Sequence, residues 1–199
     1  MDREAWNDRY RTDELVWHAK PNRFLVEEVV GMQPGRALDV ACGEGRNALW
    51  LAERGWQVTA VDFSAVALAK ARRLAFERHL EVVFIEADVA RWEPPPARFD
   101  LVVVMYLHLP ELERRQALGR AAHALVSRGT ILVVGHDSTN LSEGTGGPQD
   151  PAVLFSPQDI EEDLDGLRVE RAERVYRPVQ TDDGERHAID ALVRASRPK

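Results

Sequence analysis

Short apolar runs alternate along the chain with longer segments whose apolar positions recur at helical spacing. Five runs are typical of buried strands and lie at 37–41, 58–62, 81–85, 99–105 and 130–134. The fourth is almost entirely apolar, the pattern of a central parallel strand covered on both faces. Two later segments, 167–172 and 187–195, alternate as strands do, and the hairpin signal Asp182-Asp183-Gly184 lies between them. Strands alternating with helices and closed by a hairpin predict a doubly wound α/β domain.

Helix start and stop signals predict helices within 2–15, 21–31, 48–55, 64–79, 110–129 and 156–164. Ser64 is a good N-cap, and Pro21 and Pro110 can each open a helix. The apolar face expected after Pro110 comprises Leu112, Leu118, Ala121, Ala122 and Leu125, with Gly129 as the stop. The first two helices would form a helical cap over residues 1–31, ahead of the first strand.

Composition narrows the class of protein. A chain of 199 residues with 44% hydrophobic content is enough for one globular domain, here 1–199. The net charge of −7 disfavours nucleic acid as a partner, since phosphate binding requires a basic surface. No stretch reaches the length of a membrane-spanning helix, and no signal peptide is expected. The single cysteine, Cys42, excludes an internal disulfide and favours the cytoplasm.

The first predicted strand runs through Cys42-Gly43-Glu44-Gly45 into a predicted helix. Glycines let the backbone approach a ligand, and the free N–H groups of a helix start attract an anion. Asp62 closes the second strand, 62 − 39 = 23 positions after Asp39. An acidic residue at about that spacing suits two ribose hydroxyls. The pattern predicts a cofactor that contains a nucleoside.

Asp39 helps to decide which cofactor this is. A carboxylate inside the turn repels a pyrophosphate but suits a ligand with an ammonium and a sulfonium, both of which S-adenosylmethionine carries. The third glycine of a dinucleotide site would fall at Ala48, which that motif allows. An NAD-dependent oxidoreductase therefore stays open as an alternative, as does a non-catalytic cofactor-binding module.

Residues 39–47 resemble motif I of the class I S-adenosylmethionine-dependent methyltransferases, and 42–47 resemble its tellurite-resistance and thiopurine methyltransferase-like branch. The resemblance runs from about Trp17 to the C-terminus. It implies a Rossmann-like, seven-stranded sheet, mostly parallel with one antiparallel strand. It also places Asp88 against the adenine amino group, the Val89 N–H near a ring nitrogen and Trp17 beside the methionine part. The cofactor-binding residues expected are Trp17, Asp39, Ala41, Cys42, Gly43, Arg46, Asp62, Phe63, Asp88, Val89 and Met105.

The acceptor is less clearly indicated. A soft anionic nucleophile, such as a thiolate, selenide or reduced tellurium species, needs no general base, whereas an alcohol, phenol or amine usually does. Candidate substrate-binding residues are Tyr10, His108, His136 and Asp137. His136 and Asp137 could supply a base and its orienting carboxylate, although neighbours on an extended chain point apart. A histidine that only lines the pocket is an equal alternative, so no catalytic residue is assigned.

Residues 137–156 form a long polar segment that leaves the ligand edge of the predicted sheet, which favours a substrate lid. The histidines show no metal-ligand spacing. The sequence therefore predicts an enzyme, active as a monomer or homodimer, that transfers a methyl group from S-adenosylmethionine to a small-molecule nucleophile. S-adenosylhomocysteine would be the product.

Overall fold

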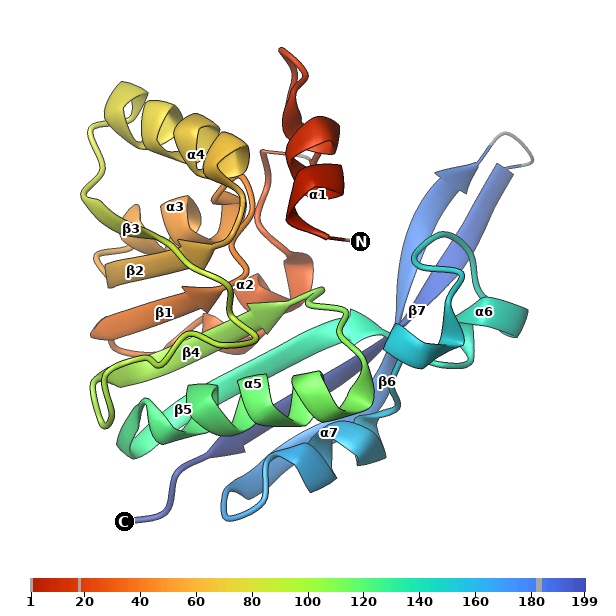
Figure 1. The fold of residues 1–199 in the computed structure, drawn as a ribbon. Helices are drawn as coiled ribbons and strands as arrows, with labels where there is room; N and C mark the ends of the chain where they lie inside the picture. Colours follow the sequence, from red (N-terminus) through yellow and green to blue (C-terminus); the bar gives the residue numbers. More distant parts are fainter. Residues whose placement is uncertain (1, 18, 182–183) are drawn as a thin grey trace.

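The computed structural model describes residues 2–17, 19–181 and 184–199 (Figure 1). Its seven strands form one sheet in the order β3-β2-β1-β4-β5-β7-β6. Only β7 runs against its neighbours, β5 and β6. The predicted sheet, mostly parallel with one antiparallel strand, is confirmed. The bounds are β1 (Arg36–Val40), β2 (Gln57–Asp62), β3 (Val82–Glu86), β4 (Phe99–Met105), β5 (Leu125–His136), β6 (Arg168–Thr181) and β7 (Gly184–Ser196).

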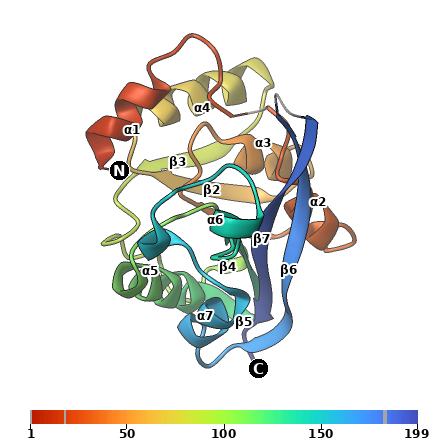
Figure 2. The ribbon, with the colours of Figure 1, turned by 90° about the vertical axis from the view of Figure 1, so that its right-hand side faces the viewer.

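Helices cover both faces of the sheet. One face packs against α2 (Arg23–Val29), α3 (Arg46–Ala52) and α4 (Ala65–Glu77). The other packs against α5 (Glu111–His123) and α7 (Pro157–Asp163). Figure 2 shows the two helical layers on either side of the sheet. Outside these layers lie α1 (Arg3–Tyr10), α6 (Asn140–Glu143) and the 3-10 turn η1 (Pro151–Val153).

Local signals explain most helix starts. The Ser64 hydroxyl accepts the Ala67 N–H at 3.1 Å, as an N-cap should. Ser156 and Asp159 form a reciprocal capping box at the start of α7. Asn22, rather than Pro21, caps α2, because its side chain accepts the Phe24 N–H at 2.8 Å. The predicted helices therefore exist, with ends shifted by a few residues.

The predicted end of the helix after Pro110 is wrong. α5 ends at His123, and Leu125 begins β5 instead of completing the helical stripe. The Ala124 carbonyl accepts the N–H groups of Arg98 and Phe99, which draws the chain into the sheet at that point. Leu112, expected on the apolar face, is 68% exposed.

The closing hairpin is longer than predicted. β6 and β7 have 14 and 13 residues, and their outer parts extend beyond the rest of the sheet (Figure 1). The predicted turn at Asp182 and Asp183 lies outside the described residues. β6 is an edge strand with mostly polar, half-exposed side chains, so its alternation is weak in the sequence.

The segment 137–156 is tied to the hairpin. The Asn140 Oδ1 accepts the Ile189 N–H at 2.7 Å, and its Nδ2 donates to the Gly146 carbonyl at 2.9 Å. A bridge pairs Asp137 with Phe155 at its base. The segment is thus a folded excursion with two helical turns rather than an open loop, and its role as a lid stays a prediction.

Candidate active site

The carboxyl ends of the parallel strands meet at one edge of the sheet, which Figure 2 views from the front. The strand order reverses between β1 and β4, where open α/β sheets bind their ligands. α1, the excursion 137–156 and the hairpin surround this edge. The site therefore has two halves, one built on β1 and β2 and the other on β4, β5 and β7.

The first half is the glycine corner, defined as residues 41–46 with Asp62. Gly43 and Gly45 adopt φ of 54° and 81°, a region that favours glycine. The Asp62 carboxylate accepts the Gly43 N–H at 2.8 Å and the Ser64 N–H at 2.9 Å, one on each oxygen. Each oxygen keeps a lone pair, so both can still accept ribose hydroxyls. Burial raises the pKa of Asp62, and these N–H groups partly offset that shift.

Asp39 lies beneath this corner and is 1% exposed. Neither of its oxygens has a hydrogen-bond partner among the described residues. Burial raises its pKa to about 7; the Ala48 N–H offsets part of the shift without reaching hydrogen-bond geometry. Asp62 raises the pKa further, and Arg46 opposes it. A buried carboxyl without a donor is costly, so a cationic ligand would satisfy it.

Tyr10 and Trp17 lie over the corner. The Trp17 Nε1–H donates to the Tyr10 hydroxyl at 3.2 Å, and a Cβ placed on Gly43 would come within 3.0 Å of that oxygen. Trp17 is 38% exposed, so it is not an ordinary core residue. Glu44, which the sequence analysis did not select, accepts the Trp17 N–H at 3.1 Å and pairs with Lys70 at 3.0 Å. The signal for Glu44 in the sequence was its position as a charged residue between Gly43 and Gly45.

The remaining cofactor candidates follow the same edge. Asp88 and Val89 are half-buried after β3, where Asp88 Oδ1 accepts the Ala90 N–H at 3.0 Å. Phe63 is half-buried after β2, and Met105 is buried at the end of β4. Their contacts to a cofactor stay predictions.

Two small positions complete the corner. Cys42 is free and buried, and burial raises the pKa of its thiol. Ala41, at the end of β1, has φ of 58°, which is unusual for a residue with a Cβ. Such strain persists where the surrounding structure imposes it, and it is common at ligand sites.

The second half, here called the histidine cluster, comprises Tyr106, His108, His136, Arg177 and Asp190. Tyr106, with φ of 60°, directly follows β4 and donates its hydroxyl to Asp190 Oδ2 at 2.8 Å. Arg177 Nε donates to the same oxygen at 3.2 Å. The His108 and His136 rings stack with centroids 5.4 Å apart. Of these five residues, only the two histidines were expected from the sequence.

Asp137 does not orient His136. It is fully buried, and its Oδ1 accepts the Thr139 N–H at 2.8 Å and Arg174 Nε at 2.9 Å. The carboxylate that faces His136 is Asp190, whose Oδ1 lies 3.2 Å from His136 Nδ1. Asp190 could have been found as the single charge within an apolar strand segment, 188–193. A substrate contact by Asp137 stays a prediction.

Arg46 is the first residue of α3 and belongs to the glycine corner. Burial lowers the pKa of its guanidinium, whereas Tyr106 and Asp39 oppose that shift.

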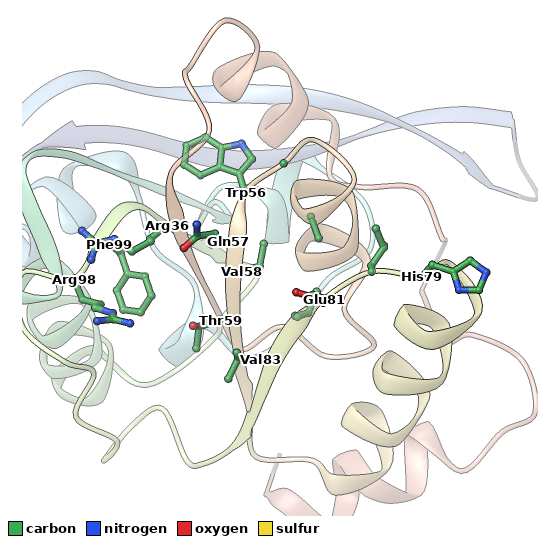
Figure 3. A pocket seen from close by; sticks show the side chains of 14 residues that line it. Arg36, Trp56, Gln57, Val58, Thr59, His79, Glu81, Val83, Arg98 and Phe99 are labelled. Carbon is green, nitrogen blue, oxygen red and sulfur yellow. The ribbon is translucent and has the colours of Figure 1, made fainter.

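A hollow of about 730 Å³ lies at the opposite edge (Figure 3). Its lining includes Arg36, Gln57, Val83 and Phe99, which stand at the amino ends of β1 to β4. It is open to solvent and distant from the glycine corner, so we assign it no role. Among the described residues, no three metal-ligating side chains gather, and no helix is long and apolar enough to cross a bilayer.

The sheet order, with its reversed β7, and the glycine corner together define the class I methyltransferase fold. Residues 37–129 match the family model described as a methyltransferase domain. The chain is also 37% identical, over 123 residues, to a demethylmenaquinone methyltransferase from Thermus thermophilus. That match covers 61% of this chain and 54% of the relative, so the chain aligns with about half of that protein.

Two solved structures share the fold at 18% identity. The N-methyltransferase NodS from Bradyrhizobium japonicum, in complex with S-adenosyl-l-homocysteine, has a TM-score of 0.76 and covers 99% of this chain and 98% of its own. TehB from Haemophilus influenzae has a TM-score of 0.75, and the match covers 98% of this chain and 66% of TehB. With the family match, these similarities support a class I methyltransferase fold.

Proposed function

We propose that the chain transfers a methyl group from S-adenosylmethionine to a small-molecule nucleophile. The observation that carries this proposal is the buried Asp39, which has no hydrogen-bond partner among the described residues, together with an Asp62 held by the Gly43 N–H. Bound S-adenosylmethionine would supply the activated methyl group on its sulfonium. The methyltransferase domain match supports this cofactor, as does the S-adenosyl-l-homocysteine bound to NodS.

Each element of the corner has a distinct role in this proposal. Asp39 neutralises the ammonium and sulfonium, Asp62 accepts both ribose hydroxyls, and Gly43 lets the backbone approach. Asp88 and Val89 bind the adenine. Tyr10 and Trp17 cover the corner and exclude water from it, which matters because the reaction requires a nucleophile held in line with the methyl carbon.

The acceptor is a separate proposal. The string 42–47 favours a thiol, selenium or tellurium species, as in the tellurite-resistance and thiopurine methyltransferase-like branch. The name of the Thermus relative points instead to demethylmenaquinone, and NodS is described as an N-methyltransferase. A cytoplasmic location, and a monomer or homodimer, stay predictions from the sequence.

An NAD-dependent oxidoreductase is disfavoured, because a pyrophosphate would lie against the buried Asp39 carboxyl. Titration calorimetry with S-adenosylmethionine, S-adenosylhomocysteine and NAD tests the choice. We expect both adenosyl ligands to bind and NAD to give no heat above dilution. If NAD binds and neither adenosyl ligand does, the proposal is overturned. Binding without turnover of any nucleophile in a panel would favour a non-catalytic module.

A further inference from the structure

The histidine cluster holds a buried His–Asp pair whose partners lie far apart in the sequence. His136 Nδ1, at the end of β5, lies 3.2 Å from Oδ1 of Asp190 on β7. Asp190 is fully buried, and its other oxygen accepts hydrogen bonds from Tyr106 and Arg177. Neither Nδ1 nor Oδ1 has another partner among the described residues. The pair is within ion-pair distance but does not meet hydrogen-bond geometry.

This arrangement fixes what each ring nitrogen of His136 can do. A proton on Nδ1 would satisfy Asp190, which leaves the lone pair on Nε2. The His136 side chain keeps 11% of its surface exposed although Nδ1 is fully buried. Among the described residues, Nδ1 but not Nε2 is both buried and without a hydrogen-bond partner. Gly147 packs against the ring, because a Cβ on it would lie 2.7 Å from Cδ2 and 2.8 Å from Cγ and Nε2.

His108, the other histidine of the cluster, cannot serve as the base. Its Nε2 already accepts the backbone N–H of His136 at 3.2 Å. Burial, and then the proximity of His136, lower its pKa to about 4; Asp190 and the Tyr106 backbone oppose this only in part. His108 is therefore neutral at physiological pH.

The other groups facing His136 also keep one charge state. Burial, Asp190 and a hydrogen bond to it raise the pKa of Tyr106 further above neutrality, so its phenol stays protonated. Burial acts to lower the pKa of Arg177, but Tyr106 and Asp190 outweigh it and raise the pKa. Of the two histidines, His108 already uses its Nε2 as an acceptor, whereas His136 has its Nδ1 beside Asp190.

We propose that His136 Nε2 is the general base of the methyl transfer and that Asp190 is its positioning residue. The inference rests on the proposed function and names its acceptor class: an O–H or N–H group that keeps its proton at neutral pH. As the oxygen or nitrogen bonds to the methyl carbon, the sulfur–methyl bond breaks and its electron pair returns to sulfur. The acceptor proton moves to Nε2 and from there to solvent.

This acceptor class differs from the one that the glycine string favours. A thiol ionises at about pH 8.5 and attacks as a thiolate, so it has little need of a base. A phenol or hydroxyl stays protonated at that pH, and general base catalysis typically contributes about 10²–10⁴-fold. For a thiolate, the cluster would only line the site and would not act as a base.

The first test reads the histidine directly and needs no substrate. Protein with 15N-labelled histidine, with and without S-adenosylhomocysteine, reports the tautomer of each ring by its nitrogen chemical shifts. We expect His136 to carry its proton on Nδ1, and Asp190→Asn to shift it toward a mixture. His123→Gln, on the exposed face of α5, serves to assign signals. An Nε2-protonated His136 in the wild type would overturn the proposal whatever the acceptor.

The second test compares two probe acceptors, phenol and benzenethiol, by release of S-adenosylhomocysteine. With phenol, His136→Gln should lose about 100-fold or more in rate and also lose the acidic limb of the pH–rate profile. With benzenethiol it should change only a few-fold, and His123→Gln should match the wild type on both. Equal rates for wild type and His136→Gln with phenol would refute the base. A wild type that does not bind the cofactor refutes the proposed function instead.

Discussion

The glycine corner and the histidine cluster lie at the same edge of the sheet but differ in how the sequence encodes them. The corner is built from residues 41–46 and from Asp62, a single β–α–β unit. The cluster joins residues as distant as Tyr106 and Asp190, 84 positions apart. The first is readable as a local motif, whereas the second exists only after β4, β5, β7 and β6 have paired. Cofactor binding and acceptor chemistry should accordingly be separable by mutation.

The largest expected effect is at Gly43. Gly43→Val should abolish cofactor binding, because φ is 54° there and a Cβ would meet the Tyr10 hydroxyl at 3.0 Å. The His136 tautomer should be unchanged if the two halves are independent. Calorimetry and the NMR signals measure the two effects. Gly31→Val is the control, since Gly31 also has positive φ but nothing within 4 Å of an added Cβ.

Asp39 should affect stability and binding in opposite directions. Burial raises the pKa of Asp39 from 3.8 to about 7. The stability that this carboxyl contributes is therefore full below its pKa in the unfolded chain, and it is lost as the pH rises through 7. Asp39→Asn should therefore raise the stability at about pH 8, by at most about 4 kcal/mol, and by little at about pH 4. The same change should weaken S-adenosylmethionine binding. Denaturant unfolding measures the stability, and calorimetry measures the binding. If Asp39→Asn binds S-adenosylmethionine as tightly as the wild type does, Asp39 does not pair with the ammonium.

Asp62→Ala should weaken cofactor binding by about 2–3 kcal/mol, because charged hydrogen bonds to the ribose are lost. The Gly43 and Ser64 N–H groups also lose their acceptor, so some thermal stability should be lost as well. Asp150→Ala, at an exposed cap, controls for a general effect of removing a carboxylate. An unchanged affinity by calorimetry would remove Asp62 from the ribose site.

The same contrast explains how far the sequence could be read. All seven strands and most helices were predictable, because a buried parallel strand such as Phe99–Met105 is apolar throughout. The end of α5 was not, since Leu125 is equally apolar on a helix or in a strand. Asp190 was missed because strand periodicity shows that it is buried but not which side chain it meets. Its partner depends on the antiparallel register of β5 with β7, which places Asp190 directly opposite His136.

The smallest and most selective effect is expected in the excursion 137–156. Gly147→Ala would place a Cβ 2.7–2.8 Å from the His136 ring, so it should displace the ring or this segment. Gly146→Ala is a matched control, with a similarly positive φ but open space around the Cβ. If the segment closes over the acceptor, Gly147→Ala should lower turnover more than Gly146→Ala does. Cofactor affinity should stay within about 1 kcal/mol for both.

Hydrogen exchange separates closure from simple packing against the ring. Asn140 anchors the segment to β7, so we expect the Ile189 amide to be protected with or without ligand. The amides around Gly146 and Gly147, beyond that anchor, should exchange with cofactor alone and become protected when phenol and S-adenosylhomocysteine are both present. Full protection of those amides in the free protein would show that the segment is a fixed wall. The Gly147 effect would then be steric, and the division into a cofactor half and an acceptor half would still hold.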